Sequence, residues 1–439
     1  MKRHLILSVF VFIIALLLSS VLIESSDSIA SAAGPEFLNK SIEGEDINSF
    51  SNSSYKSDNI LPAKKLNAGG LYPVPKLEKT NLVFTGSNKV NLRNLPNFDT
   101  TFNGKYAGIS AKNDFIFYTL DKNLQDFAKE IVRKANAPHL AIVAMDPATG
   151  RILAIADKST QIKDLSLHNG FPAASLFKVV TTAAGLETKA ISPESMIHFR
   201  GGTYTLNKFN YMPISKKDRR VMSVTEALGL SCNPVFGRVA LQLLSPTILR
   251  RYVDRFGFNS PLGFDVKLEE SPAYVPDNSD YELSRTAAGF GEIRISALHA
   301  AAMMSGVAND GFMPKPYIIN NITSQNGKPL FQAQPQMLRQ IVNTKTANVL
   351  LNMMESTTTK GTSKSEFMFK KKPVLPYSVA AKTGTLSGTN PKGLNHWFIA
   401  AAPIDNPKIA VAVISVNPTR TNAKASRIGR QMIQKFLGY

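Results

Sequence analysis

Residues 139–157 read HLAIVAMDPATGRILAIAD, and this stretch does most to decide the fold. Two apolar runs of strand length flank the segment DPATG, whose Asp, Pro and Gly residues favour a tight turn. We therefore expect an antiparallel hairpin here. Three further strand-like runs occur near the C-terminus, at residues 378–385, 396–402 and 409–416. Together with the hairpin they predict a five-stranded antiparallel sheet.

Helical patterns fill much of the remaining sequence. Helices are predicted for SLFKVVTTAAGLE, which begins at Ser175, and for VTEALGL, which begins at Val224. An amphipathic helix is predicted for LQDFAKEIVRKA over residues 124–135, from the spacing of its apolar residues. Helices of this kind cover the faces of a sheet. The predicted fold class is α/β, more narrowly α+β, with a five-stranded antiparallel sheet flanked by helices.

The N-terminus predicts a membrane anchor. A basic segment, residues 2–4, precedes the uncharged run LILSVFVFIIALLLSSVLI over residues 5–23. That run approaches the length of about 20 residues with which a helix crosses a bilayer. The basic flank before it and the acidic residues after it place the N-terminus in the cytoplasm and the rest of the chain outside. The alternative is a cleaved secretory signal ending near Ala30-Ser31-Ala32, although the apolar part of such signals is typically about 7–15 residues long.

Composition divides the chain into four segments. The stretch after the anchor is rich in Ser, Asn, Asp and Lys without apolar periodicity, which is typical of a flexible tether. Short apolar runs separated by Asn, Gly and Asp then predict a small β-rich subdomain. The predicted boundaries are 1–24 for the anchor, 25–75 for the tether, 76–117 for the subdomain and 118–439 for the main domain.

The charge balance and the cysteine count exclude several classes of function. The 439 residues include 51 Lys and Arg against 32 Asp and Glu, a net charge of +19, which suits nucleic acid, anionic lipid or an acidic wall polymer. Predicted export disfavours nucleic acid. Lipid or wall polymer would be attracted to the basic clusters 216–220 and 370–372, for which solvated loops are the ordinary alternative. The single cysteine, Cys232, excludes an intramolecular disulfide and a Cys-rich zinc site, and we expect neither a metal nor an organic cofactor.

Three short strings carry the candidate chemistry. They are Ser175-Leu-Phe-Lys178, Ser231-Cys-Asn233 and Lys382-Thr383-Gly384-Thr385. Such strings also arise by chance, as Ser53-Ser-Tyr-Lys56 in the tether illustrates. Their settings distinguish the three, because the first opens an apolar helix, the second lies between helical segments and the third ends a strand.

The first string suits nucleophilic catalysis. A serine hydroxyl needs a neighbouring base, and Lys178 lies one helical turn after Ser175 on the same face. Lys178 acts as that base only when it is neutral, and burial together with a second cation in the site would lower its pKa. The alternative is an ordinary solvated lysine. A serine at a helix start also has main-chain N–H groups available to an oxyanion.

The third string places a cation, two hydroxyl groups and a glycine on one strand. Alternation puts Lys382 and Gly384 on one face and Thr383 and Thr385 on the other. Lys382 and the threonine hydroxyls would bind a substrate carboxylate, and Gly384 would let another main-chain segment approach closely. A main-chain N–H near Thr385 would complete an oxyanion hole.

In this order and spacing the strings resemble the transpeptidase domain of penicillin-binding proteins, within the serine acyl-enzyme group that includes serine β-lactamases. IVAMDPATGRILAIAD, EALGLSCNPVF, AAGFGEIRISALHAAAMMSGVANDG and NHWFIAAAP add to the resemblance, which extends roughly from residue 118 to residue 437. It implies a class B-like monofunctional peptidoglycan D,D-transpeptidase that is acylated by β-lactams.

The resemblance also implies a role for each candidate residue. Ser175 would be acylated, Lys178 would activate it, and Ser231 would relay a proton to the leaving amine. Asn233 would hold the substrate backbone. The terminal carboxylate of a D-Ala-D-Ala stem peptide, or the acid group of a β-lactam, would be bound by Lys382, Thr383 and Thr385.

Several expectations and alternatives follow from the departures from this family. We recognise no glycosyltransferase region and no signature of a large N-terminal pedestal, so the partner-binding module is expected to be reduced or absent, with wall-synthesis machinery an open candidate as partner. The expected location is the inner membrane, which the chain crosses once, with a periplasmic catalytic domain.

Alternative functions share parts of this pattern. A D,D-carboxypeptidase has the same motifs, whereas a β-lactamase is disfavoured because no E-x-x-L-N segment follows Ser231. A β-lactam sensor or non-catalytic scaffold is the alternative outside enzymes, and Cys232, which lacks a partner histidine nearby, is expected to be a packing residue.

Overall fold

A computed structural model describes residues 77–84 and 90–438. The predicted membrane anchor and the predicted tether lie outside the described residues. Within the described part of the chain, no helix is long and apolar enough to cross a membrane.

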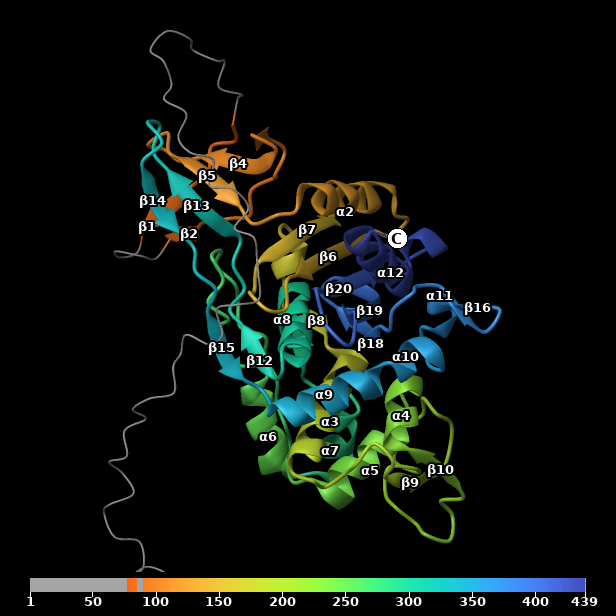
Figure 1. Ribbon diagram of the computed structural model, residues 1–439. Helices are drawn as coiled ribbons and strands as arrows, with labels where there is room; N and C mark the ends of the chain where they lie inside the picture. Colours follow the sequence, from red (N-terminus) through yellow and green to blue (C-terminus); the bar gives the residue numbers. More distant parts are fainter. Residues whose placement is uncertain (1–76, 85–89, 439) are drawn as a thin grey trace, which may run out of the picture. The chain divides into compact units, whose positions relative to one another are not determined.

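A five-stranded antiparallel sheet is the centre of the main domain, as the sequence predicts (Figure 1). Its strand order is β18-β19-β20-β6-β7. The five strands are β18 (Ala380–Thr389), β19 (Lys392–Ala402), β20 (Ile409–Val416), β6 (His139–Met145) and β7 (Ile152–Ser159). The predicted hairpin is β6 and β7. Because β18 and β19 pair out to Thr389 and Lys392, this second hairpin is longer than the sequence suggested.

Helices cover both faces of this sheet, which is why every residue of β6 and β20 is buried. On one face, α8 (Ala297–Ala308) packs against β20, β6 and β19, and every residue of α8 is buried. On the other face lie α2 (Lys122–Lys134) and α12 (Ala425–Leu437). The side chains of β6 alternate between the two cores, with Val143 on the α8 side and Ile142 on the α2 and α12 side.

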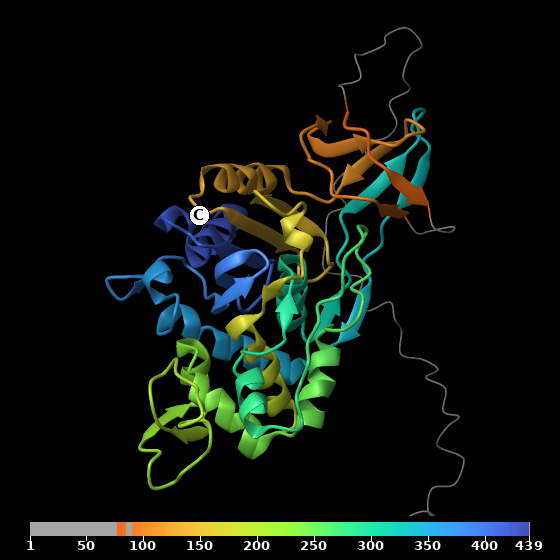
Figure 2. The same cartoon turned by 180° about the vertical axis from the view of Figure 1, so that it is seen from behind.

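A helical lobe packs beside the α8 face. Its centre is α3 (Phe177–Glu187), in which Phe177 to Gly185 are all buried. Around it are α4 (Val224–Leu230), α5 (Asn233–Leu243), α6 (Pro246–Arg255), α7 (Asp280–Ala287) and α9 (Thr344–Met354). The strands β9 (Met196–Phe199) and β10 (Arg220–Ser223) pair with each other, and the long segment between them lies beside α5 (Figure 2).

The small β-rich region forms a second five-stranded sheet, with the order β14-β13-β5-β4-β3. Three of its strands are consecutive in the chain: β3 (Thr101–Phe102), β4 (Lys105–Ile109) and β5 (Phe115–Tyr118). The other two, β13 (Ile319–Thr323) and β14 (Pro329–Gln332), come from after α8, and β13 pairs with β5. The sequence pattern did not predict this contribution, because local patterns carry no information about which distant strands pair. The predicted domain boundaries stay a prediction.

Short elements connect these parts. They are β1 (Leu82–Phe84), β2 (Val90–Leu92), η3 (Leu165–Leu167), β8 (Phe171–Pro172), η4 (Ala174–Leu176), β11 (Arg294–Ile295), β12 (Phe312–Pro314), β15 (Met337–Gln340), α10 (Ser356–Thr359), α11 (Lys364–Phe367), β16 (Met368–Phe369), β17 (Lys372–Pro373) and η5 (Thr421–Ala423).

Candidate active site

Ser175 is the middle residue of η4, which leads directly into the buried helix α3. The chain enters this position through β8, which pairs with β11, and Ala173 N donates to Ile293 O at 3.0 Å. Ala174 has a φ of 50°, a left-handed conformation that a residue with a Cβ seldom adopts. The residue before Ser175 is therefore held in a strained conformation by its surroundings.

Lys178 is fully buried beneath Ser175. Its Nζ lies 2.9 Å from Ser175 Oγ and 2.7 Å from Asn233 Oδ1, and it also donates to the main-chain carbonyl of Ala288. Burial, and then the positive charge of Lys382, lower the pKa of Lys178 well below its usual value. The structure thus provides both conditions under which the sequence predicts a neutral lysine.

The second string, Ser231-Cys-Asn233, places the side chains of Ser231 and Asn233 in the same site as Ser175 and Lys178. Ser231 follows α4 in a left-handed conformation, with a φ of 58°, and Asn233 opens α5. Asn233 Nδ2 donates to Tyr204 O at 2.7 Å, so its Oδ1 is left to face Lys178. Both side chains are nearly buried, at 6% exposure each.

Lys382 connects the third string to the second. It is fully buried, and its Nζ donates to Ser231 Oγ at 2.9 Å and to Thr383 O at 2.8 Å. Burial lowers the pKa of Lys382 to about 7. Its direct partner in the described structure is therefore Ser231, while Thr383, Gly384 and Thr385 line the cleft itself.

A cleft of about 500 Å³ runs between β18 and the helical lobe. The strand β18 is at the edge of the sheet, so an extended ligand can lie along its free side. A Cβ on Gly384 would lie 3.3 Å from Ala174 Cβ and 3.4 Å from Ser175 N, which shows how closely this strand approaches the nucleophile. Of the eight candidate residues, Ser175, Ser231, Asn233, Thr383, Gly384 and Thr385 line the cleft, and the two lysines lie beneath it.

Sequence reasoning missed several residues of this cleft. Ala288 and Gly289 follow α7 and act through main-chain atoms, which leave no signature in a side-chain motif. Tyr204 lies in the segment between β9 and β10, and the hydroxyl of Thr362 bonds to that of Thr383. The family-like stretch AAGFGEIRIS contains Ala288 and Gly289, but nothing local indicates what they contact.

Gly289 supports the nucleophile directly, and its replacement tests that support. It has a φ of +94°, and a Cβ there would lie 2.0 Å from Ala174 O and 3.0 Å from Ser175 N. Both are main-chain atoms, so the Gly289→Ala variant must displace the chain at Ser175. A shift of about 1 Å can cost a reaction about a hundredfold, and we expect the rate of penicillin acylation to fall by about that factor.

Gly327→Ala is the matched control for this variant. Gly327 has a similar φ of +81°, but nothing lies within 4 Å of its Cβ position. Both variants carry the left-handed penalty of about 1 kcal/mol in folding free energy. Stopped-flow acylation and thermal unfolding of both separate the effects, and an equal loss of acylation in the two would contradict the role of Gly289.

The charge of Lys382 makes a prediction about pH. Lys178 acts as a base only when neutral, so acylation rises as pH increases through its pKa. Because the positive charge of Lys382 lowers the pKa of Lys178, the Lys382→Met variant has a higher Lys178 pKa. We expect the acidic limb of the pH–rate profile for penicillin acylation to move to higher pH. Lys424→Met, which removes a half-exposed lysine at the edge of the cleft, is the control and should leave the limb in place. A limb that stays or moves to lower pH in Lys382→Met would contradict the coupling.

The remaining sequence features lie outside the cleft. Cys232 is fully buried in the core, and burial raises the pKa of its thiol, as suits a packing residue rather than a nucleophile. Of the basic clusters, 216–220 lies at the end of the segment between β9 and β10, and 370–372 lies at the turn between β16 and β17. No group of His, Cys, Asp and Glu side chains suited to a metal ion occurs among the described residues.

Comparison with known proteins identifies one family over most of the main domain. The sequence model of the family described as "Penicillin binding protein transpeptidase domain" matches residues 140–434. Peptidoglycan D,D-transpeptidase PbpA of Mycobacterium tuberculosis is 26% identical over 340 residues, covering 68% of this chain and 67% of the relative. Across the curated relatives that it matches, the chain spans about half to two thirds of their length.

Solved structures share the fold. A D,D-transpeptidase domain of a peptidoglycan glycosyltransferase from Eggerthella lenta has a TM-score of 0.61 at 23% identity, covering 78% of this chain and 86% of that one. Penicillin-binding protein A of M. tuberculosis, as its ceftriaxone acyl-enzyme, has a TM-score of 0.60 at 23% identity, covering 75% and 80%.

Proposed function

Because the chain belongs to the penicillin-binding protein transpeptidase family, we propose that Ser175 and Lys178 catalyse the cross-linking of peptidoglycan stem peptides. The protein is a serine-type D,D-transpeptidase, and β-lactams acylate the same serine. The donor substrate is a stem peptide ending in D-Ala-D-Ala, and the acceptor is an amine of a neighbouring stem peptide.

The environment of Lys178 Nζ is the observation that carries this proposal. A neutral amine has two N–H donors and one lone pair. Asn233 Oδ1 and the Ala288 carbonyl accept the two N–H groups, which leaves the lone pair for the Ser175 hydroxyl 2.9 Å away. Lys178 therefore takes the hydroxyl proton while Ser175 Oγ attacks the carbonyl carbon of the penultimate D-Ala.

The oxyanion and the leaving group are served by the other two strings. Main-chain N–H groups at Ser175, at the start of the helix, and near Thr385 face the developing oxyanion. When the C–N bond breaks, Ser231 gives its proton to the nitrogen of the departing D-Ala and is replenished from Lys178. Since Lys382 already donates to Ser231 Oγ, the hydroxyl proton of Ser231 is free to point toward the leaving amine.

The second half of the reaction transfers the acyl group. The acceptor amine attacks the ester carbon, and its proton passes through Lys178 to Ser175 Oγ as the ester bond breaks. In the first half of the reaction, the hydroxyls of Thr383 and Thr385, with the charge of Lys382 behind them, bind the terminal carboxylate of the donor, which then leaves with D-Ala. Asn233 contacts the substrate backbone from the opposite wall.

Two hydrolytic alternatives share the nucleophile. A carboxypeptidase resolves the acyl-enzyme with water, and a β-lactamase does so rapidly with the help of a base. Among the described residues that line the cleft there is no Asp or Glu, which favours a long-lived acyl-enzyme over rapid hydrolysis.

Incubation of the full chain with a D-Ala-D-Ala peptide and an amine acceptor, followed by mass spectrometry, distinguishes transpeptidation from the two hydrolytic reactions. Exchange product supports transpeptidation, hydrolysed peptide alone supports a carboxypeptidase, and rapid turnover of penicillin supports a β-lactamase.

The location of the enzyme is part of the proposal. The apolar run over residues 5–23 anchors the chain in the inner membrane, with the catalytic domain on the periplasmic side. Cell fractionation tests this, since the full chain should stay with membranes through an alkaline wash and a chain lacking residues 1–24 should not. An N-terminus that begins near residue 33 in the mature protein would instead support a cleaved signal.

A further inference from the structure

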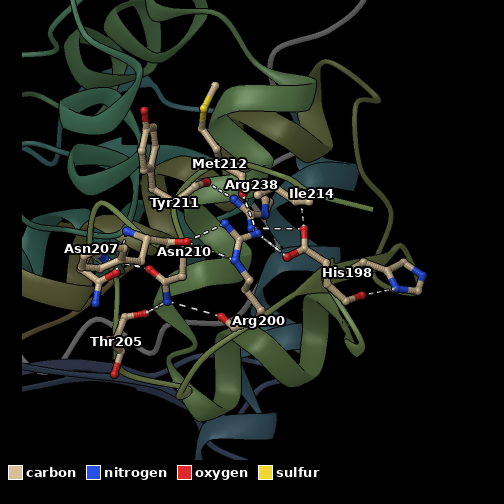
Figure 3. Close-up of polar contacts among 11 residues, drawn as sticks. His198, Arg200, Thr205, Asn207, Asn210, Tyr211, Met212, Ile214 and Arg238 are labelled. Carbon is tan, nitrogen blue, oxygen red and sulfur yellow. Dashed lines mark hydrogen bonds and ion pairs between the residues drawn. The ribbon is translucent and has the colours of Figure 1, made fainter. Parts of the chain in front are cut away.

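A buried charge cluster lies outside the cleft, in the segment between β9 and β10 and on α5 (Figure 3). Its members are Arg200, Asp218 and Arg238, here called the Asp218 cluster. Arg200 Nη1 lies 2.7 Å from Asp218 Oδ1, and Arg238 Nη2 lies 3.2 Å from Asp218 Oδ2. The side chains are 17%, 3% and 0% exposed in the order Arg200, Asp218 and Arg238. Burial of three charges is costly, and no step of the mechanism uses them.

The side chains of the Asp218 cluster bind main-chain atoms of the segment between β9 and β10 as well as one another. Arg200 donates to Phe209 O at 2.6 Å and to Met212 O at 2.9 Å, and Arg238 donates to Tyr211 O. Asp218 in turn accepts from Ile214 N at 2.9 Å. Figure 3 shows Arg200 and Arg238 beside Tyr211, Met212 and Ile214 of this segment. The path of residues 209–214 is therefore determined by three charged side chains.

The same segment holds the active-site asparagine at two points. Thr203 O accepts from Asn233 N at 2.8 Å, and Tyr204 O accepts from Asn233 Nδ2 at 2.7 Å. Asn210 holds the main chain on both sides of Thr203 and Tyr204, because its Nδ2 donates to Arg200 O at 3.3 Å and to Thr205 O at 2.8 Å. Arg238 lies further along the helix that Asn233 opens, so the cluster and Asn233 share one rigid element.

The orientation of the Asn233 amide decides whether the lone pair of Lys178 Nζ points at the Ser175 hydroxyl. With Nδ2 bound to Tyr204 O, the amide oxygen faces Lys178 and accepts an N–H. If the Tyr204 carbonyl moved, the amide could rotate and point its own N–H groups at the lysine. Lys178 would then lose one of the two acceptors that aim its lone pair at Ser175.

We propose that Arg200, Asp218 and Arg238 are positioning residues, which fix the segment between β9 and β10 so that Tyr204 O orients Asn233 and Asn233 orients Lys178. The inference rests on the proposed function of Ser175 and Lys178. It adds that the alignment of Ser175 and Lys178 depends on the Asp218 cluster, which lies outside the cleft and acts through Asn233.

A double-mutant cycle tests this relay. Asp218→Asn keeps the size of the side chain but removes its charge, and Asn233→Ala removes the side chain through which the cluster acts. We expect Asp218→Asn to lower the rate of penicillin acylation by about ten- to a hundredfold in the wild-type background. In the Asn233→Ala background the same change should have an effect of about twofold or less, because coupled residues are not additive. Asp277→Asn, which breaks the exposed ion pair with Arg250, is the matched control and should leave acylation unchanged.

A second variant keeps the test decisive if Asp218→Asn does not fold. Arg200→Lys retains the positive charge beside Asp218 but loses the forked contact with Phe209 O and Met212 O, so it should fold and still acylate more slowly. Thermal unfolding monitors both variants. Wild-type acylation in folded variants would overturn the proposal, as would an equal loss with and without Asn233. Failure of the wild-type protein to form any Ser175 adduct would overturn the proposed function instead.

Discussion

The Ser175→Ala variant is expected to release D-Ala from a D-Ala-D-Ala peptide on the order of 10⁶-fold more slowly than the wild type. The physical reason is that no other hydroxyl among the described residues takes the place of Ser175 Oγ beside Lys178 Nζ. This substitution leaves the rest of the cleft in place, because Ala differs from Ser175 in η4 only by the missing hydroxyl. Liquid chromatography of the released D-Ala measures the rate.

Ser53→Ala is the matched control, since Ser53-Ser-Tyr-Lys56 is the second S-x-x-K string of the chain. This variant should release D-Ala at the wild-type rate. Substantial turnover by Ser175→Ala, or loss of turnover in Ser53→Ala, would contradict the assignment of the nucleophile.

Replacement of Lys178 should have the next largest effect. Lys178→Met has a similar length but no base, and it leaves Asn233 Oδ1 and the Ala288 carbonyl without their donor. General-base catalysis is worth up to about 10⁴-fold, so we expect acylation by penicillin to fall by about 10³- to 10⁴-fold. Stopped-flow measurement of acylation, with circular dichroism as a check on folding, gives the result.

Lys178→Arg separates a base from a simple positive charge. An arginine stays protonated in proteins, so it provides charge but cannot take the Ser175 proton. We expect Lys178→Arg to be as slow as Lys178→Met, whereas Lys345→Met, at an exposed lysine on α9, should acylate normally. If Lys178→Arg kept most of the rate, the role of Lys178 would be electrostatic and the neutral-amine mechanism would be wrong.

Much of the central domain was predictable from local pattern. The strands over residues 139–157 and 409–416 are apolar because both faces of the sheet are covered, and such runs are easily recognised in a sequence. The helix over residues 124–135 was predicted from its spacing and lies at Lys122–Lys134. In contrast, the pairing of β13 with β5 joins segments about 200 residues apart, and no local pattern encodes that pairing.

The candidate site divides in the same way. The candidate catalytic side chains lie in short strings, so Ser175, Lys178 and Ser231 could be singled out from the sequence, Ser231 with the help of the family resemblance. The groups that orient them are main-chain atoms, such as the carbonyls of Ala288 and Tyr204, and any residue type has a carbonyl. The buried position of Lys382 against Ser231 likewise depends on how β18 meets the helical lobe, so the sequence suggested only its role as a carboxylate-binding cation.

The most direct test of the central claim is the intact mass and peptide map of the full chain after incubation with benzylpenicillin. We predict a single stable adduct, located on Ser175. An adduct on another residue, or no adduct in a folded protein, would contradict the claim that Ser175 is the acylated nucleophile of a penicillin-binding transpeptidase.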